Sequence, residues 1–309
     1  MATIDPGQDY DVIHTLTFAV GSGTCNIRLY RGSSSEYSGT VYYRAGTSGA
    51  WTELSVSGTR TTFPVSSTTM QIGHNHNKDG NHYMTASFYG QSTNLTGIAI
   101  SQKAALSGAM GDYFMRYYAY RCSSLTSLDV PDTSGLTTVG ASFLYYYARG
   151  CSSLTSLDVP DTSGLTTVGS SFMSYCAYGC SSLTSLAVPD TSGLTSAGTG
   201  FMYRYAYNCT SLLRLELPAA GWFVGHDIDW AVPSGRLNHL KGYVTNSTDR
   251  TAWQALTAET KTLYINYVRS SGDVILEGAA GGAGRLIGSK SRLIGGPSPL
   301  IGGPSPLIG

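Results

Sequence analysis

Hydrophobic and polar residues alternate in short runs along the first third of the chain, and clusters of Gly and Ser separate the runs. A period of two residues is typical of β-strands that bury one face. A hairpin tip is expected where the sequence reads Asn-Lys-Asp-Gly, at residues 77–80. The spacing of the runs favours a small β-sandwich over residues 1–91. The predicted strands are residues 12–20, 25–30, 40–44, 52–56, 68–73 and 82–89.

The middle of the chain, residues 92–218, carries a repeat. Cys122, Cys151, Cys180 and Cys209 lie 29 residues apart, and the sequence between them is nearly copied from one interval to the next. A looser copy precedes the first of these cysteines, and a truncated copy follows the last. A period of this length is typical of a solenoid in which every repeat forms one coil.

The first half of each repeat predicts a short strand and a turn. In the copy that begins at Cys122, the residues Leu125, Leu128 and Val130 are spaced to point inward. Pro131 is expected to end the strand, because proline has no N–H to donate to a neighbouring strand. The sequence that follows, Asp-Thr-Ser-Gly, is typical of a turn.

The second half of each repeat supplies another inward wall. Leu136 and Val139 are expected to be buried there. Residues 143–148 favour a short helical turn that places Phe143 and Ala148 inside. One coil cannot bury this set of side chains alone, so the coils must stack to share a continuous core.

The repeat resembles the BspA-like leucine-rich repeats of bacterial surface antigens. The resemblance is carried by the run Cys-Ser-Ser-Leu-Thr-Ser-Leu and the Asp-Thr-Ser turn after it, and it covers residues 92–218. That family is associated with adhesion and with host or matrix binding, and similar repeats occur in proteins encoded by phages of gut bacteria. The strand pattern of residues 1–91 is similar to the immunoglobulin-like modules that often accompany such repeats.

The region after the repeats, residues 219–276, is expected to close the solenoid. Trp222, Phe223 and Trp230 are large enough to cover the open end of the core. A last strand is predicted at residues 241–244, followed by a helix-start sequence and one or two helices. These features predict a helical C-terminal cap.

Residues 277–309 form a tail in which Leu-Ile-Gly recurs with a period of seven after a Gly- and Ala-rich linker. Four Leu-Ile pairs cannot build a core in a segment broken by Gly and Pro, so we expect each pair to fill an apolar pocket on a neighbouring subunit. The alternative is a disordered linker. The predicted assembly residues are Leu286, Ile287, Leu293, Ile294, Leu300, Ile301, Leu307 and Ile308.

Composition excludes several function classes. Charged residues make up 12% of the chain, and 19 Lys and Arg balance 19 Asp and Glu, so a basic nucleic-acid footprint is absent. No window approaches about 18 unbroken apolar residues, so no membrane span is predicted. The first eleven residues lack a basic signal region, and the apolar stretch at 16–20 is too short for a signal peptide. We therefore expect folding in the cytosol.

Motifs for catalysis or metal binding are few. Neither H-E-x-x-H, nor G-x-S-x-G, nor a Walker-type loop occurs, so we expect no enzyme activity and no cofactor. His74, His76 and His82 form the nearest approach to a metal site; a polar hairpin tip and a zinc site are the two interpretations, and the prediction is no metal. His14 has no partner visible in the sequence.

The phased cysteines are expected to be a structural ladder of buried, unpaired thiols at one corner of the coil. Aspartates are phased as well: Asp132, Asp161 and Asp190 form one ladder, and Asp129 and Asp158 form another. A cation bound between coils and capping of the turn backbone are the two interpretations of the first ladder.

Tyrosines form two further ladders with the period of the repeat. Some rings must pack between coils, and exposed rings would make a rigid recognition surface; both interpretations stay open. The outward strand residues Ser127, Ser156 and Ser185 are expected to line a flat polar strip. The candidate binding residues are Tyr117, Tyr146, Tyr175, Tyr120, Tyr178, Tyr207, Asp129 and Asp158.

These patterns predict a mainly β protein: an N-terminal β-sandwich, a short leucine-rich-repeat solenoid with 29-residue repeats, a helical C-terminal cap and an extended tail. The predicted function is a non-enzymatic structural and adhesive subunit. The leading hypothesis is a phage protein of a head or tail appendage, made in the host cytoplasm and displayed on the virion surface. Its expected partners are other subunits of a homo-oligomeric assembly and a host surface protein or glycan. The alternative is a bacterial cell-surface adhesin or extracellular filament subunit.

Overall fold

The computed structural model describes residues 10–31, 34–57, 61–75, 85–89, 94–186, 189–191, 193–212, 214–216, 241–244 and 275–276. This part of the chain is built from strands and turns and contains no helix, which confirms the mainly β prediction for it. All of the described residues belong to one compact unit. The predicted hairpin tip, the helical part of the predicted cap and the assembly tail lie outside the described residues.

Two sheets form the N-terminal part. In the first, β1 lies between β7 and β9 and is antiparallel to both, and β4 and β5 follow beyond β7. In the second, β2 pairs with β3, β6 and β8. The strands are β1 (Val12–Phe18), β2 (Thr24–Arg31), β3 (Ser34–Tyr37), β4 (Gly39–Ala45), β5 (Thr52–Val56), β6 (Thr61–Pro64), β7 (Thr69–His74), β8 (Thr85–Phe88) and β9 (Leu95–Gln102).

Each of the six strands predicted in this region has a counterpart, whereas β3 and β6 were not predicted. The alternation that predicted them is visible in β1, where Val12, His14, Leu16 and Phe18 are buried and the residues between them are more exposed. Buried side chains of both sheets belong to one apolar cluster, so the two sheets share a core. His14 takes a position in this core that the pattern would give to an apolar residue.

The repeats form a β-solenoid of about three turns, with two columns of short parallel strands. Equivalent residues of successive repeats are paired across the strands, as in Thr138 with Thr167 and Ser156 with Ser185. The first column is β10 (Ser107–Met110), β12 (Gly135–Val139), β14 (Thr167–Val168) and β16 (Ser196–Ala197). The second is β13 (Ser156–Leu157), β15 (Ser185–Leu186), β17 (Arg214–Glu216), β18 (Lys241–Val244) and β19 (Ile275–Leu276). Strand β18 confirms the strand predicted at residues 241–244.

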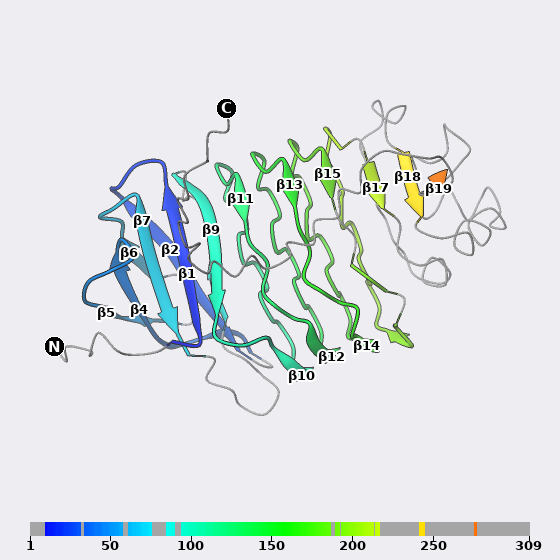
Figure 1. The fold of residues 1–309 in the computed structure, drawn as a ribbon, viewed down its shortest axis with the longest axis horizontal. Coiled ribbons are helices and arrows are strands. Elements are labelled where there is room, and N and C mark those ends of the chain that lie inside the picture. Colours follow the sequence, from blue (N-terminus) through cyan, green and yellow to red (C-terminus); the bar gives the residue numbers. More distant parts are fainter. Residues whose placement is uncertain are drawn as a thin grey trace, which may run out of the picture. The chain divides into compact units, whose positions relative to one another are not determined.

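Strand β9 joins the N-terminal sheet to the solenoid (Figure 1). Along one edge it is antiparallel to β1, with Ile98 opposite Leu16. Along the other edge it is parallel to β11 (Ser127–Leu128), with Ile98 opposite Leu128. The apolar cluster runs without interruption from Leu16 to Leu212. The N-terminal sheet therefore covers the first coil of the solenoid.

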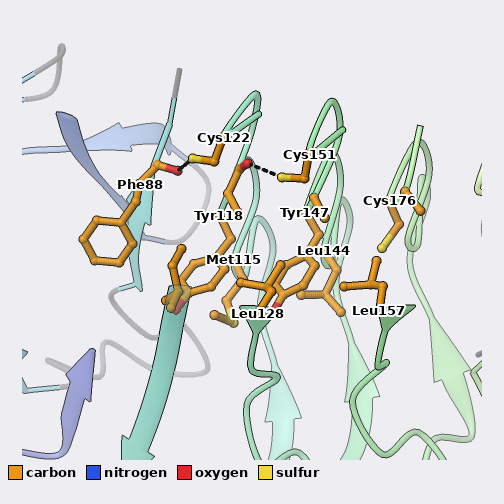
Figure 2. Close-up of a cluster of buried hydrophobic side chains, with 14 of the residues drawn as sticks. Phe88, Met115, Tyr118, Cys122, Leu128, Leu144, Tyr147, Cys151, Leu157 and Cys176 are labelled. Carbon is orange, nitrogen blue, oxygen red and sulfur yellow. Dashed lines mark hydrogen bonds between the residues drawn. The ribbon is translucent and has the colours of Figure 1, made fainter. Parts of the chain in front are cut away.

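Side chains at one repeat position stack into columns inside the solenoid. The rings of Phe114, Phe143, Phe172 and Phe201 lie 5.5–5.7 Å apart and nearly parallel. Figure 2 shows another column, in which the buried rings of Tyr118 and Tyr147 stack. The predicted inward residues Leu125, Leu128, Leu136, Val139, Phe143 and Ala148 are all buried, and Val130 is partly buried. Each buried Leu, Val or Phe contributes roughly 1.5–3 kcal/mol relative to an exposed position.

The helical turn predicted at residues 143–148 is wrong. Four turn segments, residues 113–121, 142–150, 171–179 and 200–208, have positive φ at alternate positions, as at Ser142, Leu144 and Tyr146. A helix needs negative φ throughout. From residue 116 to residue 121, the N–H groups instead alternate between a carbonyl three residues earlier and a carbonyl of the next coil. In the first segment, Tyr117 donates to Tyr145 O of the next coil, while Tyr118 closes a turn on Met115 O.

Candidate functional site

The four turn segments display a regular array of tyrosine and arginine side chains. Because the coils are stacked with a period of 29 residues, three positions of each turn segment form three columns. All the Tyr and Arg side chains in these columns are partly exposed. We call this array the tyrosine–arginine grid; its columns are Arg116, Tyr145, Ser174 and Tyr203; Tyr117, Tyr146, Tyr175 and Arg204; and Tyr120, Arg149, Tyr178 and Tyr207.

Neighbouring rings of the grid pack on one another. The ring centroids of Tyr117 and Tyr146 are 5.0 Å apart, and those of Tyr146 and Tyr175 are 4.8 Å apart. Tyr178 and Tyr207 stack at 4.9 Å with an interplanar angle of 12°. These separations follow the spacing of adjacent strands, roughly 4.8 Å. Packing between coils and partial exposure therefore occur together in the same rings. Packing between coils is confirmed, and a role of these rings in recognition stays a prediction.

Each arginine of the grid lies among tyrosine rings. The guanidinium carbon of Arg149 is 4.7 Å from the ring centroid of Tyr146, 4.6 Å from that of Tyr178 and 5.6 Å from that of Tyr120. Arg116 and Arg204 each contact three rings at 4.9–6.0 Å. A stacked guanidinium keeps its N–H donors at its edges, so the rings fix its direction without using its donors.

The electrostatic character of the grid is positive. The four turn segments contain Arg116, Arg121, Arg149 and Arg204 but no Asp or Glu, although the whole chain has zero net charge. The Nε of Arg116 is buried and has no hydrogen-bond acceptor among the described residues.

Two tyrosines of the grid, Tyr145 and Tyr175, have phenol groups with a raised pKa. Burial, together with a hydrogen bond to Tyr146, raises the pKa of Tyr145 above its usual value of 10.0. Burial is also the largest cause of the raised pKa of Tyr175. These hydroxyls are therefore donors, and the grid combines them with guanidinium donors.

The aspartate ladders do not join the grid. Asp132 and Asp161 each accept hydrogen bonds from the backbone N–H and hydroxyl of the serine two residues later, which is turn capping. Asp129 is partly buried and accepts from Ile100 N, whereas Asp158 is exposed. The serine strip is present: Ser127, Ser156 and Ser185 are all exposed.

The cysteine ladder lies inside the coil, as expected. All four phased cysteines are unpaired and at most 1% exposed. Cys122 Sγ donates to Phe88 O at 3.4 Å, and Cys151 Sγ donates to Ala119 O at 3.0 Å (Figure 2). Burial is the largest cause of the raised thiol pKa of Cys180, which is about 12 instead of 9.0. These groups hold the coil together rather than react.

A buried hydrogen-bond chain links the N-terminal sheet to the first turn segment. His14 Nδ1 lies 2.9 Å from the hydroxyl of Tyr118, and His14 Nε2 lies 3.1 Å from His74 Nε2. His74 Nδ1 lies 3.2 Å from the carbonyl oxygen of Asn75, which can only accept. With both imidazoles neutral, one proton order satisfies every link: Tyr118 donates to His14, His14 donates to His74, and His74 donates to Asn75.

No pattern in the sequence predicts the partnership of His14 and Tyr118, which lie 104 residues apart. His76 and His82, which were grouped with His74, lie outside the described residues. Among the described residues, no three His, Cys, Asp or Glu side chains are placed to hold a metal ion together. In the same residues no helix has the length and apolar character needed to cross a membrane.

Five Tyr and Arg members of the grid were missed in the sequence: Arg116, Tyr145, Arg149, Tyr203 and Arg204. Tyr145 and Tyr203 share a column with Arg116, and the signal that would have found them is the same 29-residue period.

Neither a family model, nor a curated protein, nor a solved structure matches this chain.

Proposed function

We propose that this protein is a non-enzymatic structural and adhesive subunit that binds a host or matrix surface through its repeats. The tyrosine–arginine grid carries the proposal. Tyrosine and arginine are enriched at protein recognition sites, where rigid aromatic side chains lose little conformational entropy on binding. In the grid these side chains are already ordered by ring packing. They therefore lose little further conformational entropy when a ligand binds.

The finer classification of the fold belongs to the same proposal. We infer that the coils are BspA-like leucine-rich repeats, that the N-terminal sheets form an immunoglobulin-like β-sandwich, and that residues 219–276 are a helical cap. The buried leucine columns and the parallel pairing of 29-residue units support the first inference. The core shared by the two N-terminal sheets supports the second.

The proposed location is the surface of a phage virion. No disulfide joins any of the six described cysteines, as expected of a protein that folds in a reducing cytosol. Virion proteins assemble in that compartment before release. The alternative location is a bacterial cell surface or an extracellular filament.

Fractionation tests the location. An antibody against this chain should detect it in density-purified phage particles from a producing culture. Detection on washed cells or sheared filaments would favour the alternative instead. Recovery only as free soluble protein would overturn both.

Adhesion of beads coated with the full chain to a panel of intact bacterial cells tests the function. Replacing Tyr146, Tyr175 and Tyr178 by Ser should reduce retention of the beads. Because these rings are partly buried, the matched Tyr→Phe triple variant, which keeps the packing and loses only the hydroxyls, should be made beside it. The control replaces the exposed Ser127, Ser156 and Ser185 by Ala and should adhere normally. If a folded Tyr→Ser variant adheres like the parent, the grid is not the binding surface.

A further inference from the structure

The grid is rich in hydrogen-bond donors and has no negatively charged acceptor. Every column contains partly exposed phenols and one guanidinium group, and no carboxylate occurs in the four turn segments. Charge complementarity therefore favours a ligand with negative groups. Arginine binds planar carboxylates through two parallel N–H···O bonds, which suits this anion in particular.

The ring packing argues against nucleic acid as that ligand. Proteins that bind single strands leave aromatic faces open so that bases can stack on them. Here Tyr178 and Tyr207 stack on each other at 4.9 Å, and the Tyr146 ring lies between Tyr117 and Tyr175.

The spacing of the grid suits an extended chain. Ring centroids in the column of Tyr117, Tyr146 and Tyr175 are 5.0 and 4.8 Å apart, a distance comparable to one sugar unit in a linear polysaccharide. The arginines lie in different coils, with Arg116 in the first, Arg149 in the second and Arg204 in the fourth turn segment. A ligand that repeats its charged unit could contact several coils and gain avidity.

We propose that the tyrosine–arginine grid binds a linear polysaccharide that carries carboxylate groups, with its chain along the stack of coils. This inference rests on the proposed adhesive function and specifies its ligand. The guanidinium edges of Arg116, Arg149 and Arg204 pair with the carboxylates, and the phenol hydroxyls donate to ring and hydroxyl oxygens of the sugars.

The test uses the full chain and polygalacturonate, with fully methyl-esterified polygalacturonate as the matched neutral polymer. Titration calorimetry should show binding to the acid form that is at least about tenfold tighter than to the ester, and that weakens with added salt. The triple variant Arg116→Gln, Arg149→Gln and Arg204→Gln should lose at least about tenfold in affinity. Lys103→Gln, which removes one positive charge outside the grid, should bind like the parent.

Several outcomes would overturn the proposal. Equal binding of the acid and ester forms would remove the role of the carboxylate, and unchanged affinity in the folded triple variant would remove the role of the arginines. Tighter binding to dextran sulfate or to oligo(dT) would assign the grid to another polyanion. Arg149→Lys keeps the charge but not the paired donors, so an intermediate affinity supports carboxylate pairing even if the triple variant is unstable.

The same variants separate this inference from the proposed function. If no polysaccharide binds, yet beads coated with the triple variant lose adhesion to bacteria, the adhesive function stands and the ligand class is wrong. If those beads adhere like the parent, the arginines are not needed for adhesion and the polysaccharide proposal fails. If beads coated with the parent chain do not adhere to any cell of the panel, the proposed adhesive function fails.

Discussion

Single glycines in the coil meet two different physical demands. A Cβ at Gly169 would lie closer to the backbone carbon of Gly140, in the preceding coil, than real Cβ atoms come to other atoms. A Cβ at Gly179 would make only ordinary van der Waals contact, but its φ is 75°, which is strained for a residue with a side chain. A side chain is thus excluded at Gly169 by steric clash and disfavoured at Gly179 by backbone conformation.

Alanine substitutions should separate these two costs. Gly179→Ala should lower the free energy of unfolding by about 1 kcal/mol through φ strain alone. Gly169→Ala should cost more, about 1–3 kcal/mol or beyond, because two coil backbones must move apart. Ser170→Ala, at an exposed neighbouring residue, is the control and should change little. Urea denaturation measures all three; a smaller cost for Gly169→Ala than for Gly179→Ala would contradict the close approach of the coils.

The buried thiols predict a loss of stability in alkali. Burial raises the pKa of Cys180 to about 12 from 9.0, so between these values the unfolded chain releases a proton that the folded chain keeps. Stability from this thiol is complete below pH 9 and falls by about 1 kcal/mol per pH unit up to pH 12. Denaturation of the parent at pH 8 and pH 10.5 should show this fall, and Cys180→Ala should show a smaller one. An equal fall in the variant would mean that the thiol ionises as easily in the fold as out of it.

Among the elements, the strands were readable from the sequence and the turn segments were not. Alternating residues in β1 predicted its buried face because a strand's period is two. In the segment that starts at Ser142, Phe143 and Leu144 are buried, and so are Tyr147 and Ala148 four residues later. That spacing matches a helix, in which the backbone hydrogen bonds form within the segment. Only the hydrogen bonds to neighbouring coils distinguish the observed turn segment from the predicted helical turn.

The grid illustrates the same limit at the candidate site. The phase of Tyr117, Tyr146 and Tyr175 was visible because identical residues recur every 29 positions. Arg149 interrupts the other tyrosine ladder, and its place among three rings follows from the stacking of the coils. A search for repeated residue types finds the first arrangement and misses the second.

The hydrogen-bond chain between β1 and the first turn segment predicts an energetic coupling. Tyr118→Phe removes the donor to His14 Nδ1 and should cost about 1–3 kcal/mol. His14→Phe removes the acceptor. Because the two residues act on one bond, the double variant should cost less than the sum of the single variants by more than about 0.5 kcal/mol. Additive losses in urea denaturation would show that the chain does not link the two elements.

For the whole molecule, the domain boundary predicted after residue 91 falls just before a strand that serves two structures. Strand β9 pairs with β1 on one side and β11 on the other, and the core passes through it. The sequence shows where the pattern of residues changes, but the pairing partners of β9 are distant in the chain. Ile98 illustrates the double role of β9, because it lies opposite Leu16 on one side and Leu128 on the other.

The tail, residues 277–309, is predicted to act in assembly with neighbouring subunits. Deleting residues 285–309 should leave a folded protein that no longer joins its particle or filament, because the Leu-Ile pairs that would dock on neighbouring subunits are lost. Thermal unfolding should match the parent, and copurification with the assembly should drop. A variant that replaces only Ser and Pro residues of the tail with Ala is the control. Full incorporation of the truncated chain would show that the tail is a passive extension.

The near identity of the coils bears on how this protein can change over generations. Each coil bonds to the coil before it and the coil after it, in one register that repeats at every step. A duplication or loss of one 29-residue unit by unequal recombination would therefore preserve the N-terminal sheet and the pairing at both new junctions. It would lengthen or shorten the grid by one rung, roughly 4.8 Å. The number of binding positions would then change by one repeat at a time, without any substitution.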